Sequence, residues 1–346
     1  MTRRFMLALA VAAACAGCGS GAGLHIEDGG RTVTPGRVTN PTAPPPTGVT
    51  TPPQPGLHLG APAALAYADG ALWCAVHPGT GVLVGSLVKV SAASGAPEGA
   101  AVPLPPARQP YLLTVGADGV WLAAGTRLWQ IDPDTGAAKF TISLGGSTTA
   151  VLDTAGSVWA TVTTPRGGRL VRVSPGSGTI VSQTVVGPSP SALTVADGLA
   201  WVTDRVDQSI LRFAIGRRPV RRTGSIPLPR SAVRAPSQIT VTAGRVWVYE
   251  RGRVLRIDPA TDRVIGTTSL APAAGGTIAA GTSGVWVITR TRVRHLGAVR
   301  LLDPASGLPV GRRIVVGGDP TAIVTDGSTA WVFDSATTRL IRISAG

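Results

Sequence analysis

The sequence predicts an all-β fold, a seven-bladed β-propeller of four-stranded antiparallel blades. A tryptophan with a glycine two to four residues ahead of it recurs seven times after residue 56, at a mean interval of 43 residues. Glycine (45) and proline (29) are abundant and only 14 % of the 346 residues are charged, which disfavours both a disordered chain and a helical bundle. A four-stranded sheet repeated at this interval is a propeller blade, and seven copies close a ring.

The repeated tryptophans mark the second strand of each blade. They are Trp73, Trp121, Trp159, Trp201, Trp247, Trp286 and Trp331. In the fifth unit, four short extended segments are visible at 238–241, 245–249, 254–257 and 264–270. A turn that begins at Asp258 and continues with proline separates the third segment from the fourth. Turns with Asp or Ser followed by Pro recur at 132, 174 and 303, and this is tight-turn chemistry. Short alternating apolar segments between such turns are typical of strands.

We expect an N-terminal strand to close the ring. The last unit has only three strands, and the third of them ends at 340–343. Residues 56–60 match the ends of the fourth strands at 141–145 and 314–317. They are therefore predicted to supply the missing outer strand of blade seven. Joining both ends of the propeller in one sheet removes an open sheet edge.

The residues ahead of the propeller are predicted to export and tether it. Residues 1–4 are basic and 5–16 are apolar, which is the pattern of a signal peptide too short to span a bilayer. The segment ahead of Cys18 resembles a bacterial lipobox, although Cys15 stands where that motif prefers leucine. The resemblance implies a signal peptide over 1–17 and a lipid on Cys18. Cleavage after Ala16 by an ordinary signal peptidase, which gives a secreted protein, is the alternative.

The remaining chain divides into a tether and a propeller. Residues 30–56 contain eight prolines and seven threonines, a composition that favours extended polyproline-like conformations over a packed core. We therefore predict a tether over 18–55 and the propeller over 56–346. After lipobox processing only Cys18 and Cys74 remain, so neither a disulfide framework nor a cysteine metal site is expected. Cys74 follows Trp73 in an apolar strand, as a small buried hydrophobic residue would.

Three parts of the repeat carry a family resemblance. They are the repeated Trp-Val strand, the run Val-Leu-Arg-Ile-Asp-Pro-Ala-Thr at 254–261, and the connection Val-Gly-Gly-Asp-Pro at 316–320. Through them the propeller region resembles the extracytoplasmic YVTN and streptogramin-lyase-like (virginiamycin B lyase-like) propellers. The resemblance is specific for architecture and weak for activity, because this fold hosts binders, scaffolds and enzymes.

Histidine is the first residue type to consider for catalysis. The lyases that the repeat resembles use histidine, a carboxylate and Mg²⁺ to open a lactone by elimination. The four histidines are His25, His58, His77 and His295, and none forms a closely spaced His-x-Glu pair. We therefore expect no cofactor and no metal, with Mg²⁺ needed only if the lyase alternative holds. His77 and His295 stay candidates, because a ring of blades around a channel allows a base from another blade to meet one of them.

One set of polar residues recurs at the end of the second strand. Three residues after the repeat tryptophan lie Asp204, Glu250 and Asp334, in blades four, five and seven. Arginines accompany them: Arg205 and Arg251 follow directly, and Arg290 lies near the matching place in blade six. Equivalent positions in a ring converge on one face. Together with His77 these residues predict a polar rim suited to a ligand or cation, and solvated strand ends are the alternative.

Positive charge is concentrated in the second half of the chain. Residues 201–346 carry a net charge of +12, whereas residues 1–200 carry +2. The densest group is the basic patch Arg217, Arg218, Arg221 and Arg222. Such a field attracts anionic partners, here anionic lipid headgroups or wall polymers, with a merely solvated surface as the alternative. Nucleic acid is not expected, because an exported protein rarely meets it and no aromatic residues interleave to stack bases.

A second ring of residues lies two positions before each turn between the third and fourth strands. Its members are Lys89, Gln130, Arg172, Arg212, Arg256, Leu301 and Arg342. Five of the seven are basic. We predict that their aliphatic stems cover apolar surface between blades while their charged ends reach water, which is a structural role.

These features favour a binding protein over an enzyme. We predict an exported, monomeric propeller, anchored by lipid at the outer face of the cell membrane, that acts as a binding or scaffold module for a protein partner or an envelope ligand. The alternative is a lyase-like enzyme of the streptogramin B type, which would use the polar rim to eliminate a lactone.

Overall fold

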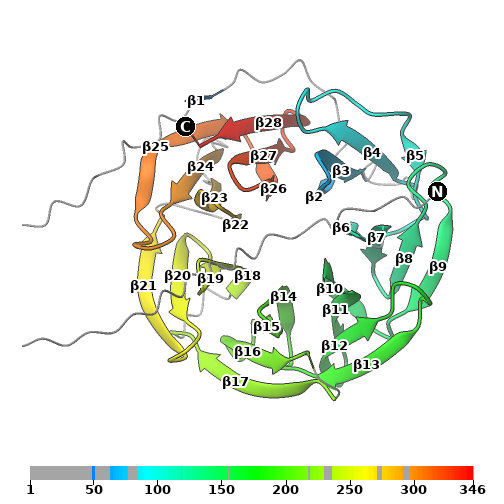
Figure 1. The fold of residues 1–346 in the computed structure, drawn as a ribbon, viewed down its shortest axis with the longest axis horizontal. Helices are drawn as coiled ribbons and strands as arrows, with labels where there is room; N and C mark the ends of the chain where they lie inside the picture. Colours follow the sequence, from blue (N-terminus) through cyan, green and yellow to red (C-terminus); the bar gives the residue numbers. More distant parts are fainter. Residues whose placement is uncertain are drawn as a thin grey trace, which may run out of the picture.

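The computed structural model describes residues 49–50, 63–76, 84–117, 119–154, 156–216, 219–229, 236–270, 275–290 and 297–345. The described residues form strands joined by turns and irregular connections, with no helix among them, and the strands assemble into seven four-stranded antiparallel sheets. Figure 1 shows the sheets as blades around a central axis, in sequence order. The predicted seven-bladed β-propeller is confirmed.

Each blade runs from the centre of the ring to its outside (Figure 1). The innermost strands are β2 (Ala63–Ala68), β6 (Leu112–Gly116), β10 (Ser147–Thr154), β14 (Pro190–Ala196), β18 (Pro236–Thr242), β22 (Gly275–Gly281) and β26 (Pro320–Thr325). The second strands are β3 (Ala71–Val76), β7 (Gly119–Ala124), β11 (Ser157–Thr164), β15 (Leu199–Asp204), β19 (Arg245–Glu250), β23 (Gly284–Arg290) and β27 (Thr329–Asp334).

The outer half of each blade follows the same order. The third strands are β4 (Ser86–Ser91), β8 (Arg127–Ile131), β12 (Gly167–Val173), β16 (Ser209–Ala214), β20 (Arg253–Asp258), β24 (Gly297–Leu302) and β28 (Arg339–Ser344). The outermost strands are β5 (Val102–Pro103), β9 (Ala138–Ser143), β13 (Ile180–Val185), β17 (Arg221–Pro227), β21 (Arg263–Ser269), β25 (Pro309–Gly317) and, in blade seven, β1 (Val49–Thr50). In blade five, the strands begin and end within two residues of the predicted segments.

The ring is closed by an N-terminal strand, as predicted. β1 pairs antiparallel with β28, with Val49 opposite Ser344 and Thr50 opposite Ile343. The closing strand that the structure describes therefore lies ahead of the predicted segment 56–60, which is outside the described residues. Blade seven is thus built from both ends of the chain.

The hydrophobic core is divided among the gaps between blades. Seven clusters of buried side chains occur in the described residues, and each joins two neighbouring blades. Six repeat tryptophans are at most 3 % exposed, and each packs in the cluster shared with the following blade. Trp331 of blade seven joins Leu72 and Cys74 of blade one, which completes the circle. Every blade therefore buries its apolar side chains against both of its neighbours.

The predicted second ring lies directly across the sheet from the repeat tryptophans. Trp73, for example, is paired with Lys89, and Trp201 with Arg212. Four of these cations lie over the tryptophan ring, at centroid distances of 5.5 Å (Lys89), 5.1 Å (Arg172), 5.6 Å (Arg212) and 6.0 Å (Arg256). These residues were expected to cover apolar surface between blades. The structure shows how four of them do so, because each cation lies over a tryptophan ring of the core in a cation–π contact.

Candidate functional site

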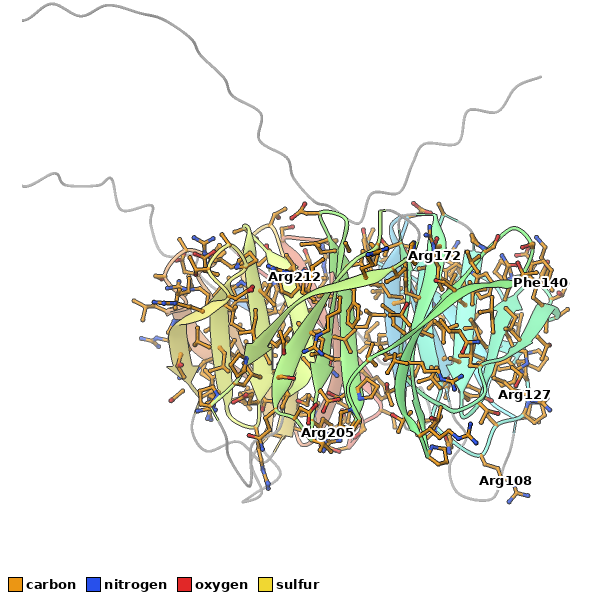
Figure 2. The ribbon with its side chains drawn as sticks, turned by 90° about the horizontal axis from the view of Figure 1, so that it is seen from below. Arg108, Arg127, Phe140, Arg172, Arg205 and Arg212 are labelled. Carbon is orange, nitrogen blue, oxygen red and sulfur yellow. The ribbon has the colours of Figure 1, made fainter. Side chains whose placement is uncertain are left out.

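The turns between second and third strands lie on one rim of the ring, which we call the lower rim. Arg127 and Arg205, at two of these turns, are at the bottom of Figure 2, together with Arg108. Arg172 and Arg212, near the ends of their third strands, lie toward the opposite rim (Figure 2). The predicted polar residues of blades four, five and seven therefore share one face of the protein, as their spacing indicated.

Asp204 ends β15 and is fully buried. Its carboxylate accepts hydrogen bonds from the backbone N–H groups of Ser189 (2.8 Å), Val206 (3.0 Å) and Asp207 (2.8 Å). Ser189 belongs to the connection that enters blade four, and the other two donors belong to the turn that follows Asp204. The carboxylate thus holds two loops of the lower rim together and leaves its neighbour Arg205 exposed.

Asp334 plays the same part in blade seven and is also fully buried. It accepts hydrogen bonds from the N–H of Asp319 (2.6 Å) and the hydroxyl of Thr337 (2.6 Å). Asp319 in turn accepts a hydrogen bond from the Ser335 hydroxyl (2.7 Å) and an ion pair from Arg290 (2.9 Å). Arg290 of blade six is therefore tied to blade seven, and the pair lies at the surface with both side chains about 40 % exposed.

Glu250 of blade five is buried beside an arginine of its own turn. Arg253 donates from Nε to Glu250 Oε2 at 2.6 Å and closes an ion pair with the same oxygen. The neighbouring Tyr249 is buried, and burial raises the pKa of its phenol, while the charges of Arg290 and Arg251 lower it. A Cβ on Gly276 of β22 would collide with the Tyr249 hydroxyl, so this side chain packs against the first strand of blade six.

The lower rim presents arginine and apolar groups to solvent. Arg205 is exposed, Val206 beside it is 68 % exposed, and Arg251 and Arg290 are partly exposed. The three carboxylates point into the protein instead. In the part of the chain that the structure describes, no group of three or more His, Cys, Asp or Glu side chains is placed to hold a metal ion. The three rim carboxylates are instead engaged by hydrogen bonds and an ion pair within the protein.

Several predicted residues lie outside the described residues. They are Cys18, His25, His58, His77, His295, Arg217 and Arg218. The other half of the basic patch, Arg221 and Arg222, begins β17 on the outside of blade four, and both side chains are exposed. The described residues contain no helix with the length and apolarity needed to cross a bilayer.

A separate hollow of about 360 Å³ lies beside the turn between the third and fourth strands of blade two. Gly119, Gln130, Asp132, Thr135 and Lys139 are among its lining residues. Asp132 accepts hydrogen bonds from the N–H groups of Asp134 and Thr135 and from the Thr135 hydroxyl. These bonds lower the pKa of Asp132 and use its Oδ1 to hold the turn.

Some rim residues are not apparent from the repeat pattern alone. Asp319 and Ser335 join Arg290 to Asp334, and Arg253 neutralises Glu250. Asp319 lies in the connection 316–320 that marks the family resemblance, so the sequence singled out this segment but did not indicate the contacts of Asp319. The repeat does not indicate the roles of Arg253 and Val206, because the conformation of each individual turn determines where they lie.

No protein-family model and no curated protein matches the chain. Among solved structures, BamB from Moraxella catarrhalis is similar with a TM-score of 0.56 and 13 % identity, over 82 % of this chain and 84 % of that one. The periplasmic gluconolactonase PpgL of Pseudomonas aeruginosa is similar with a TM-score of 0.60 and 15 % identity, over 74 % and 86 %. A chain of the mitotic checkpoint complex has a TM-score of 0.64 and 7 % identity, over 93 % and 99 %. At these identities the likeness establishes the propeller fold alone.

Proposed function

We propose that this protein is an exported β-propeller, anchored by lipid on Cys18 at the outer face of the cell membrane, that serves as a binding scaffold for a protein partner. The basic and apolar start of the chain and its lipobox-like cysteine support export and anchoring. Solved propellers of the same fold include BamB and a chain of the mitotic checkpoint complex, so the fold is compatible with a role in a protein complex.

One observation carries the binding proposal: the rim carboxylates are used inside the protein. Asp204 and Asp334 accept backbone hydrogen bonds that fix the rim loops, and Glu250 is neutralised by Arg253. The residues left at the surface are Arg205 and Val206 on a turn held in one conformation. A pre-ordered surface loses little conformational entropy when a partner binds. A carboxylate that acts as general acid or base would instead have to face the substrate at the rim.

The anchoring part of the proposal is tested by changing Cys18→Ala in the full chain. Wild-type protein should take up labelled palmitate and remain with the membrane fraction. The Cys18→Ala variant should lose the label and leave the membrane. A variant that still partitions with membranes would contradict anchoring through this cysteine, and label-free wild-type protein in the medium would favour the secreted alternative.

The binding part is tested by photo-crosslinking in the native envelope. A crosslinking amino acid replaces Val206 on the lower rim or, as the matched control, Leu308 on the opposite rim, which is 65 % exposed against 68 % for Val206. We expect one discrete protein adduct from position 206 and none of that size from position 308. No adduct from either position, together with lactone cleavage that His77→Ala or His295→Ala abolishes, would overturn the scaffold and favour the lyase alternative.

A further inference from the structure

The outside of blades four, five and six has an unusual composition. The outermost strands β9, β13, β17, β21 and β25 contain no aspartate or glutamate. Five arginines lie on three consecutive strands of this set: Arg221, Arg222, Arg263, Arg312 and Arg313. Figure 1 shows β17, β21 and β25 side by side along the circumference. We call the outer surface of these three strands the arginine wall.

The arginine wall carries more positive than negative charge, with Asp258 opposite Arg263 on the neighbouring strand. All five guanidinium groups are exposed. Within the described residues none of the five forms an ion pair, in contrast to Arg212, Arg253 and Arg290. Arginine keeps its proton at every physiological pH, so this stretch of the surface holds a permanent positive field.

Apolar side chains are exposed between the arginines. Ile265 lies two residues after Arg263 and is 42 % exposed, and Val315 lies two residues after Arg313 and is 56 % exposed. Both pairs lie where the pairing with the neighbouring strand shifts register, and Arg263 and Arg313 each have one exposed aliphatic side chain two residues away. Arginine is enriched at protein interfaces, where apolar groups surround it.

The wall also offers unpaired backbone. β17, β21 and β25 are each the last strand of their sheet, so among the described strands none pairs with their outer edges. An exposed edge is a template for an added strand. Such additions take their affinity from main-chain hydrogen bonds and their specificity from alternate side chains.

We propose that the arginine wall is the docking surface for an acidic, extended segment of a partner protein. The segment adds to the outer edge of β21 or β25, places its carboxylates on the arginines of that strand and sets an apolar residue against Ile265 or Val315, while the arginines of the neighbouring blades attract it. A phosphate polymer or a lipid surface would use the charges but neither the edges nor the aliphatic side chains. The inference rests on the proposed scaffold function. It specifies the chemistry of the partner segment, which is acidic and extended, and the surface of the propeller to which that segment binds.

The test uses the full chain and synthetic probes. The main probe is a fluorescent peptide of alternating glutamate and valine, and its lysine–valine counterpart is the negative probe. Polyphosphate and phosphatidylglycerol vesicles represent the two other anionic surfaces. Binding is measured by anisotropy for the peptides and by co-sedimentation for the vesicles, at low and at physiological salt.

Charge reversal on the wall is compared with the same reversal elsewhere. The wall variant carries R222E, R263E and R313E. The matched control carries R108E, R127E and R166E, three exposed arginines of blades one to three, so both variants lose the same net charge. We expect the wall variant to bind the acidic peptide at least about tenfold more weakly, with the control within about twofold of wild type.

A second variant tests the apolar part of the surface. The double change I265S and V315S keeps every arginine and is expected to weaken peptide binding severalfold, which would not occur on a purely electrostatic surface. This variant also replaces the triple variant if the triple variant fails to fold. Equal losses in wall and control variants, or tighter binding of polyphosphate or vesicles than of the peptide, would overturn the proposal. If the crosslinked adduct from position 206 still forms, the scaffold function stands even though the arginine wall does not dock the segment. If no adduct forms from position 206 in a protein without the wall substitutions, both proposals fail.

Discussion

The guanidinium of Arg212 lies 5.6 Å from the ring centroid of Trp201, its direct neighbour across the sheet. From there it donates hydrogen bonds to the carbonyl of Pro259 (2.8 Å) and the carboxylate of Asp262 (3.0 Å), both in a turn of the next blade. Gly224 on the outer strand leaves room for it, because a Cβ there would come within 3.0 Å of the guanidinium. One side chain therefore joins blade four to blade five.

The same link recurs around the ring. Arg256 of blade five donates to the carbonyl of Ala305 in the turn of blade six, and Arg342 of blade seven donates to the carbonyl of Ala93 in blade one (3.4 Å). Two glycines in the turns between third and fourth strands allow these turns to pack closely on the preceding blade. Gly136 and Gly307, both with positive φ, pack against the outer strands of the preceding blade so closely that a side chain would touch them.

Removal of this link should loosen the ring. We expect Arg212→Ala to lower the free energy of unfolding by about 1–3 kcal/mol, since it removes a cation–π contact and charge-assisted hydrogen bonds. Arg205→Ala is the control, because that side chain is exposed on the rim. Urea unfolding followed by tryptophan fluorescence measures both variants. Equal stability of the two would show that the guanidinium of Arg212 is only a solvated surface group.

The buried carboxylate of Asp204 should be structural. Asp204→Ala leaves the N–H groups of Ser189, Val206 and Asp207 without their acceptor, and we expect about 2–4 kcal/mol of destabilisation. Asp207→Ala, three residues away and exposed, should cost less than about 0.5 kcal/mol. Hydrogen exchange at residues 205–207 should accelerate only in the first variant. Protection that is unchanged in Asp204→Ala would contradict the loop-holding role.

A glycine in the connection to blade four should not tolerate a side chain. A Cβ on Gly187 would collide with the carboxylate of Asp204, which its hydrogen bonds hold in place. We expect Gly187→Ala to destabilise the fold by about 1–3 kcal/mol. A Cβ on the exposed Gly216 meets nothing within 4 Å, so Gly216→Ala should leave the melting temperature unchanged or slightly raised. The reverse order of the two melting temperatures would refute the packing described for Gly187.

The buried thiol of Cys74 should make stability fall at alkaline pH. Burial raises the pKa of Cys74 from 9.0 to about 12, so above pH 9 the unfolded chain loses this proton while the folded chain keeps it. Stability is therefore lost between pH 9 and 12, with a slope that approaches about 1.4 kcal/mol per pH unit. The stability gap between wild type and Cys74→Ala should narrow as pH rises above 9. A constant gap would place the thiol in contact with water.

Much of the fold was predictable because the repeat is periodic. Seven tryptophans at regular intervals locate the second strands, and the turns that begin with Asp-Pro or Ser-Pro locate the third and fourth. Cys74 is buried as its apolar neighbours indicated. The closing strand was harder to place, since several short Thr- and Pro-containing segments precede the first blade. A two-residue pairing such as that of Val49 and Thr50 leaves no pattern to recognise.

The candidate site was predictable only in part. Repeat positions indicated that Asp204, Glu250 and Asp334 share a rim, and the structure places them there. Their orientation depends on which loop N–H groups come within reach, as at Ser189 and Asp319, and repeat spacing contains no such information. The ion pair between Glu250 and Arg253 likewise depends on the short turn between β19 and β20, which places Arg253 beside Glu250.

The most direct test of the scaffold function is the yield of the position-206 adduct in the native envelope as rim arginines are removed. Arg205→Ser and Arg251→Ser, singly and together, are compared with Arg108→Ser and Arg127→Ser, which lie on the same rim in blades one and two. We predict a stepwise loss of adduct in the first series, none in the second, and no change in melting temperature in either. Equal yields across both series would contradict a partner bound at the lower rim.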